Sequence, residues 1–75
     1  MTTILNCRRM LCPMPVIKVQ NALKDLESGE TLTVTCTDPG TLHDIPTWCR
    51  INGHSVIEQT ENDGEYVFVI DKMTS

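Results

Sequence analysis

The sequence has no run of about 18 apolar residues, so it lacks a segment that could cross a membrane as a helix. It also has few basic residues, with six Lys and Arg against ten Asp and Glu, a net charge of −4 and a pI near 4.9. This balance argues against binding of nucleic acid and favours a partner with a basic surface. The first residues lack the basic start and apolar run of a signal peptide, so we expect a cytoplasmic protein.

The chain is also short. Its 75 residues suffice for one domain, which we expect over 1–75. The sequence shows no repeat, linker or low-complexity segment. Such a chain buries only about 60% of its unfolded surface, which predicts no room for a deep substrate cleft. Its four cysteines make up about 5% of the residues, which is below the cysteine content of roughly 8–10% typical of disulfide scaffolds. Cytoplasmic thiols stay reduced, so these cysteines serve core packing, metal binding or chemistry.

The periodicity of apolar residues predicts an α/β fold with the order β-α-β-α-β-β. Two helices on one face of a four-stranded mixed sheet would form a two-layer α/β sandwich, with the threonine-bearing face left open and polar. Asn62-Asp63-Gly64 predicts a hairpin turn between the last two strands. The expected elements are a short strand at Ile4 and Leu5, a helix over about 13–27, a strand over 31–37, a helix from near His43 or Asp44 to before Gly53, and strands over 55–60 and 66–70.

The segment Cys12-Pro13-Met14-Pro15 stands at the expected junction of the first strand and the first helix. With Cys12 as the N-cap, Pro13 and Pro15 have no amides to donate, which leaves the Met14 N–H as the donor to the sulfur. The positive end of the helix dipole also favours an anion there. Cys12 therefore has the setting of a reactive thiolate or of an anionic persulfide. A buried cap, with prolines that only start the helix, is the alternative.

The residues around this segment suggest further roles. Arg8 and Arg9 are close in sequence and could lower the pKa of the Cys12 thiol. Met10, Leu11 and Met14 surround the sulfur with apolar side chains, two of them flexible, which suit a docking surface.

Two blocks of the sequence carry a resemblance to a known family. Residues 5–15, Leu-Asn-Cys-Arg-Arg-Met-Leu-Cys-Pro-Met-Pro, resemble the opening motif of the TusA or SirA-like family of small sulfur carriers, with its Cys-Pro-X-Pro signature. Residues 37–40, Thr-Asp-Pro-Gly, residues 44–49, Asp-Ile-Pro-Thr-Trp-Cys, and Gly53-His54 agree with it. The family fold is the same β-α-β-α-β-β sandwich. Two departures stand out, because the family usually has Asp where Asn6 stands and Gly where Arg9 stands.

The resemblance implies that Cys12 accepts sulfane sulfur as a persulfide and passes it to an acceptor protein, in tRNA thiolation, cofactor synthesis or sulfur oxidation. The implied donors are cysteine desulfurases or rhodanese-type proteins. Neither a cofactor nor a metal is expected, and neither is direct contact with nucleic acid or membrane. A lone acidic domain with a polar sheet face is expected to be a monomer.

The other cysteines leave alternatives open. Cys7 could resolve a Cys12 persulfide or form a disulfide with Cys12, or it could be a small packed side chain. Cys36 and Cys49 follow the apolar patterns and are expected in the core, and their wide spacing argues against zinc. Two rival functions therefore remain, a dithiol redox protein using Cys7 and Cys12 and a non-catalytic interaction module. Lys18 is expected on the solvated helix surface or facing the Cys12 loop.

Overall fold

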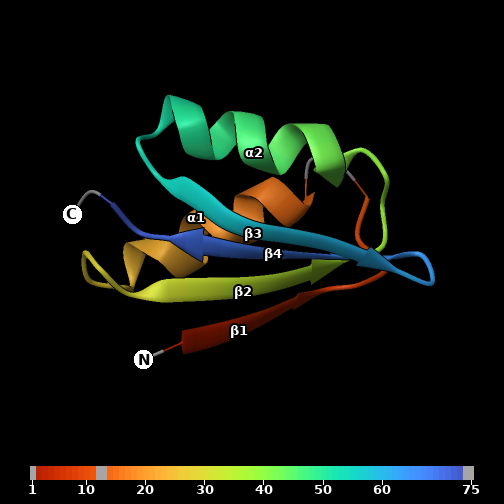
Figure 1. The fold of residues 1–75 in the computed structure, drawn as a ribbon, viewed down its shortest axis with the longest axis horizontal. Helices are drawn as coiled ribbons and strands as arrows, with labels where there is room; N and C mark the ends of the chain where they lie inside the picture. The colour runs from red at the N-terminus through yellow and green to blue at the C-terminus, as the bar shows by residue number, and fades with distance from the viewer. Residues whose placement is uncertain (1, 12–13, 74–75) are drawn as a thin grey trace.

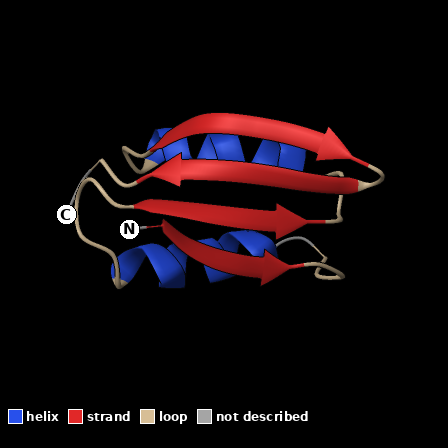
Figure 2. Cartoon of the chain, turned by 60° about the horizontal axis from the view of Figure 1, so that its bottom comes forward, coloured by secondary structure: helices blue, strands red, loops and turns tan. Residues whose placement is uncertain are grey.

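The computed structural model describes residues 2–11 and 14–73. The elements follow the predicted order, and both helices cover the same face of one sheet (Figures 1 and 2). Neither described helix is long and apolar enough to span a membrane. The elements are β1 (Thr2–Cys7), α1 (Met14–Lys24), β2 (Thr31–Cys36), α2 (Thr41–Ile51), β3 (Ser55–Asn62) and β4 (Glu65–Asp71).

The sheet is mixed, with the strand order β1-β2-β4-β3. β1 and β2 are parallel, so α1 returns the chain between them, and β4 is antiparallel to both β2 and β3. Asp63 and Gly64 connect β3 to β4 with φ angles of 50° and 78°. Two successive positive φ angles suit a type I′ hairpin turn, which the Asp-Gly pair predicts.

The core lies between the sheet and the two helices. β2 contributes Leu32, Val34 and Cys36, the alternation that the sequence predicted. β4 supplies the largest buried side chain, Phe68, which is fully buried next to Val34. The other buried apolar residues are Cys7, Val19, Leu23, Ile45, Cys49, Tyr66 and Ile70.

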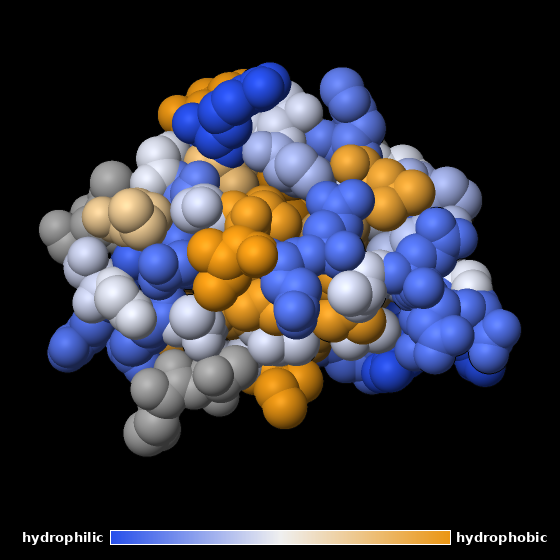
Figure 3. Space-filling view, viewed as in Figure 1, coloured by the Kyte–Doolittle hydropathy of each residue, from blue (hydrophilic) through white to orange (hydrophobic). Residues whose placement is uncertain are grey.

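The face away from the helices is more apolar than predicted. The strand register places Ile4, Thr33 and Val69 in one row across β1, β2 and β4, so two aliphatic side chains flank a threonine. Ile4 is 77% exposed and Ile57 of β3 is 58% exposed. Figure 3 shows hydrophobic atoms gathered in the middle of the molecule in this view. The prediction of a polar open face is therefore only partly right.

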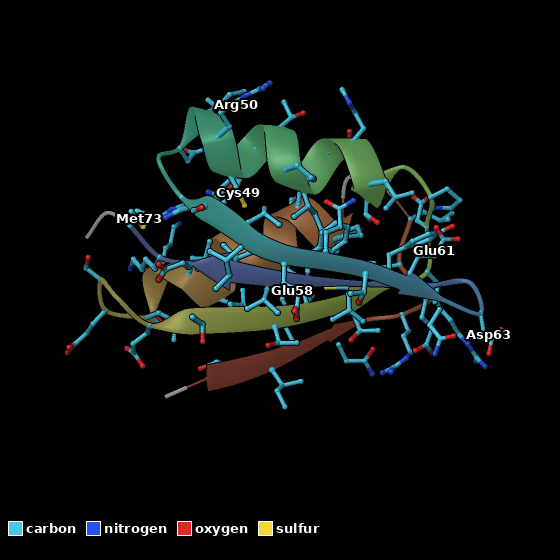
Figure 4. All side chains as sticks on the ribbon, in the orientation of Figure 1. Cys49, Arg50, Glu58, Glu61, Asp63 and Met73 are labelled. Carbon is cyan, nitrogen blue, oxygen red and sulfur yellow. The ribbon has the colours of Figure 1, made fainter. Side chains whose placement is uncertain are left out.

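The β3 edge of the sheet carries acidic side chains. Glu58, Glu61 and Asp63 are exposed along β3 and its turn, and Figure 4 shows them spread along the hairpin. Charged side chains on an edge strand discourage pairing with a second chain. The hairpin therefore protects this edge without a covering helix.

The second helix starts earlier than the sequence predicted. α2 begins at Thr41 rather than near His43, so Pro46 lies inside the helix and not in its first turn. The Thr41 amide donates a hydrogen bond to the Asp38 carbonyl, and the Gly40 amide donates to an Asp38 carboxylate oxygen. This turn at Asp38 extends the helix at its start, which the spacing of apolar residues does not reveal.

The first helix ends at Lys24, three residues before the predicted end. The Asp25 amide bonds to the Ala22 carbonyl and the Leu26 amide to the Leu23 carbonyl, so the last turn tightens to i→i+3 bonds. The expected stop at Gly29, with φ of 94°, follows in the connection to β2.

A lysine that follows β4 caps this helix. Lys72 is only 7% exposed, and its Nζ donates to the carbonyls of Leu23 and Leu26. Its backbone is fixed as well, because the Lys72 amide donates to the Glu30 carbonyl and its own carbonyl accepts from the Gly29 amide. The ammonium thus adds a second donor to the Leu23 carbonyl and provides one for the Leu26 carbonyl just beyond the end of α1.

The structure also contains a hollow that the chain length did not predict. A cavity of about 400 Å³ lies where α1, α2 and the end of β4 meet. Leu23, Trp48 and Lys72 are among its lining residues. This hollow is open to solvent and is not the deep substrate cleft that the chain length argues against.

We expect Lys72→Met to lower the free energy of unfolding by about 1.5–3 kcal/mol, because it removes a charged donor from two carbonyls. Urea denaturation monitored by circular dichroism measures this loss. Lys24→Met is the matched control, since Lys24 is an exposed lysine at the same helix end, and its effect should stay within about 0.5 kcal/mol. Equal stabilities of the two variants would contradict the capping role.

Candidate functional site

The candidate site is the segment between β1 and α1, which carries the Cys-Pro-Met-Pro motif. Cys12 and Pro13 lie outside the described residues, and the chain on both sides of them is described. The Met14 amide donates a 2.9 Å hydrogen bond to the Leu11 carbonyl, so the amide predicted to point at the sulfur already has a backbone acceptor. Pro15 is buried in the first turn of α1.

Apolar side chains are exposed beside this segment. Leu11 is 74% exposed, Met14 45% and Ile17 43%, and we call these three residues the apolar tip. Met14 and Ile17 share a face of α1 because they are three residues apart. Met10, which was also predicted to dock a partner, is half-buried and packs against the core. Ile17 was missed, although its spacing from Met14 could have indicated it.

Two side-chain acceptors hold the loop after β1. The Arg8 amide donates to Asn6 Oδ1 at 3.0 Å, and the Arg9 amide donates to Thr37 Oγ1 at 2.8 Å. The side-chain oxygen of Asn6 accepts this hydrogen bond, and a carboxylate oxygen of Asp could accept it equally well. The departure from the family pattern at this position therefore keeps the same local bond.

Arg9 occupies a strained backbone conformation. Its φ is 63°, in the left-handed region that glycine adopts without steric cost. This conformation explains why a glycine suits the position in the family pattern. The side chain of Arg9 is exposed, and its backbone rather than its charge joins the loop to Thr37.

The side chain of Arg8 pairs with Glu65 at the start of β4. Arg8 Nε lies 2.8 Å from one carboxylate oxygen of Glu65, and its Nη2 lies 3.2 Å from the other. Pairing with Glu65 raises the pKa of Arg8, and pairing with Arg8 lowers the pKa of Glu65. The pair is exposed, so its main effect is geometric: it connects the loop before Cys12 to the start of β4.

Three of the four cysteines are buried in the core. Figure 4 shows Cys49 pointing from α2 towards the sheet, on the side of the helix opposite Arg50. Burial raises the pKa of Cys49 to about 11. Burial is also the main cause that raises the pKa of Cys36 to about 12. Both thiols are therefore protonated and weakly nucleophilic at neutral pH.

The third buried cysteine, Cys7, pairs with another thiol. Cys7 and Cys36 are register partners on β1 and β2, and their side chains are hydrogen-bonded. Burial raises the pKa of Cys7, while the bond to Cys36 and the nearby charge of Lys18 oppose that rise. Lys18 thus lies near enough to act on Cys7. No cluster of three His, Cys, Asp or Glu side chains suited to a metal occurs within residues 2–11 and 14–73.

Comparison with known proteins gives consistent matches over nearly the whole chain. The family model described as "Sulfurtransferase TusA" matches residues 3–72. The "Putative sulfur carrier protein YrkI" of Bacillus subtilis is 36% identical over 69 residues, covering 92% of each chain. The "Sulfur carrier protein TusA" of Pseudomonas aeruginosa is 42% identical over 69 residues, covering 92% of this chain and 87% of its own.

A solved structure agrees with the fold. A SirA-like protein from Desulfitobacterium hafniense superimposes with a TM-score of 0.84 at 25% sequence identity. The match covers 99% of this chain and 100% of the other.

We expect Arg9→Gly to raise the free energy of unfolding by about 0.5–1 kcal/mol. The left-handed conformation costs a non-glycine residue about 1–2 kcal/mol, and the flexibility of glycine offsets roughly half of that gain. Asp63→Gly is the control, since Asp63 also has a positive φ but Asp tolerates it better, so the gain should be smaller. Chemical denaturation compares the two, and a destabilised Arg9→Gly protein would refute this account.

We expect iodoacetamide to modify one thiol, Cys12, when the native protein is treated briefly at pH 7.5. Burial and raised pKa values protect Cys7, Cys36 and Cys49, so four modifications should appear only after unfolding. Peptide mass spectrometry identifies the modified position. Native labelling of Cys7 at a rate similar to that of Cys12 would show that Cys7 is accessible, contrary to its burial.

Proposed function

Since this chain belongs to the TusA sulfurtransferase family, we propose that it is a sulfur carrier that holds sulfane sulfur as a persulfide on Cys12. The observation that carries this proposal is the burial of the other three thiols, which leaves Cys12 as the remaining candidate nucleophile. The motif Cys-Pro-Met-Pro and the helix start at Met14 supply the positive end of a helix dipole near that position.

The proposed transfer consists of two displacements. The Cys12 thiolate attacks the outer sulfur of a donor persulfide, the donor sulfur–sulfur bond breaks, and the donor leaves as a thiolate. Cys12 then carries the outer sulfur together with its proton. An acceptor thiolate attacks this outer sulfur, and Cys12 leaves as a thiolate. Each step forms one sulfur–sulfur bond and breaks another, so the transfer needs no external oxidant or reductant.

Partner proteins provide the orientation in this proposal. The apolar tip exposes Leu11, Met14 and Ile17 beside the motif, where a partner could bury them. Such partners are a sulfur donor of the cysteine desulfurase or rhodanese type and a sulfur acceptor protein. Sulfur delivery to tRNA thiolation, to cofactor synthesis or to sulfur oxidation would each use the same chemistry. A cytoplasmic location and a monomeric state stay predictions.

The rival dithiol function gains no support from the geometry. Cys7 would have to leave a fully buried position next to Cys36 before it could react with Cys12. A disulfide with Cys12 would also replace the interaction of Cys7 with Cys36. The experiment below distinguishes sulfur transfer from the interaction-module alternative, because a non-catalytic module does not need the Cys12 sulfur.

We expect incubation with a cysteine desulfurase and cysteine to add one sulfur, about 32 Da, to Cys12. The Cys12→Ala protein should gain none, because it lacks the nucleophile. Cys7→Ala is the matched control, and it should still gain one sulfur. Intact-protein and peptide mass spectrometry measure the adduct and its position. An adduct that persists in Cys12→Ala, or one that depends on Cys7, would overturn the proposal.

A further inference from the structure

The cavity at the far end of the two helices is separate from the candidate site. Both helices run away from the segment that contains Cys12, and they end where β4 ends (Figure 1). The cavity lies at these ends and measures about 400 Å³, within the size range of small-molecule sites. Leu23 of α1 and Trp48 of α2 provide its apolar and aromatic wall.

The charged groups that line the cavity are all basic. Lys24 and Lys72 line it, and no Asp or Glu does so among the described residues, although the chain has a net charge of −4. The ammonium of Lys72 is bound to two carbonyls of α1. Lys24 forms no ion pair or hydrogen bond with the described residues, so its ammonium is available to a ligand.

The carbonyls at the helix ends do not cancel this positive charge. The Asn52 and Gly53 amides donate to the carbonyls of Trp48 and Arg50, and the His54 amide donates to the Cys49 carbonyl. Lys72 does the same for α1. These bonds occupy the carbonyls of Trp48, Cys49 and Arg50 and, at the end of α1, those of Leu23 and Leu26, so these carbonyls face donors of the chain itself.

His54, which also lines the cavity, responds to the positive charge of Lys72. Its ring stacks on Trp48, with centroids 5.7 Å apart and planes inclined by 24°. Burial lowers the pKa of His54, and the charge of Lys72 lowers it further. The Nδ1 atom of His54 is buried without a hydrogen-bond partner. Burial would disfavour any charge, but the smaller effect of Lys72 shows that its positive charge acts on the ring beside the cavity.

We infer that this cavity binds small aromatic carboxylates, with the ring against Leu23 and Trp48 and the carboxylate at Lys24. The side-chain amide of Gln20, which also lines the cavity, can donate a hydrogen bond to the same carboxylate. The lining combines apolar and polar groups, so the ring of a ligand can pack on Leu23 and Trp48 while the polar side chains fix its orientation. Binding here does not involve Cys12, so it is independent of sulfur transfer.

Trp48 makes the test direct, because it is the only tryptophan in the chain. Benzoate, titrated into the full-length protein, should change Trp48 fluorescence saturably and shift the side-chain amide signals of Gln20 and Asn52 in ¹⁵N correlation spectra. Benzylamine has a similar shape and the opposite charge, so it should bind at least about fivefold more weakly. Cys12→Ala should bind benzoate as the unmodified protein does.

Two lysine variants of α1 test whether the charge of Lys24 contributes to benzoate binding. Lys24→Gln should weaken benzoate binding about threefold to fivefold, as expected for a partly exposed ion pair. Lys18→Gln removes the same charge from the same helix outside the cavity, and it should leave binding unchanged. A non-saturable response, equal binding of benzylamine, or equal effects of the two variants would each overturn the inference.

Discussion

The parallel pairing of β1 with β2 determines where the candidate site forms. Parallel strands end at the same edge of a sheet, so the segments that follow Cys7 and Cys36 leave the sheet side by side. Both helices therefore start at that edge, and the loop before Cys12 lies within hydrogen-bonding distance of Thr37. An antiparallel first pair would place these two segments at opposite edges.

Burial makes core residues of three of the four cysteines. Cys36 and Cys49 fill the small core beside Phe68, and burial keeps their thiols protonated. Cys7 is buried like its register partner Cys36, although it precedes the motif by only a few residues in the chain. Strand register, rather than distance along the sequence, separates a core thiol from a candidate nucleophile.

Patterns with a short period were readable from the sequence. The alternation of Leu32, Val34 and Cys36 predicted β2 and its buried face, and Asp63-Gly64 predicted the hairpin turn. The role of Cys7 could not be read, because three interpretations fitted it until the register with Cys36 was known. The early start of α2 at Thr41 depends on backbone bonds at Asp38, which apolar spacing does not encode.

Contacts between distant parts of the chain gave no local signal. Arg8 pairs with Glu65, 57 residues away, and no local pattern predicts that partner, while its effect on Cys12 stays a prediction. No local pattern marks Lys72 as a helix cap, because only the folded chain brings its ammonium to the carbonyls of Leu23 and Leu26. The φ of Arg9 is likewise set by the path of the loop and not by the preference of arginine.

The central place of β4 has a consequence for how the protein folds. This strand comes last in the chain, yet it lies between β2 and β3 and carries the largest core side chain. Without β4, β3 has no neighbour in the sheet, β2 has an unpaired edge, and α1 lacks the cap that Lys72 provides. Formation of the domain is therefore expected to be all-or-none, because the sheet is complete only when β4 has paired with both β2 and β3.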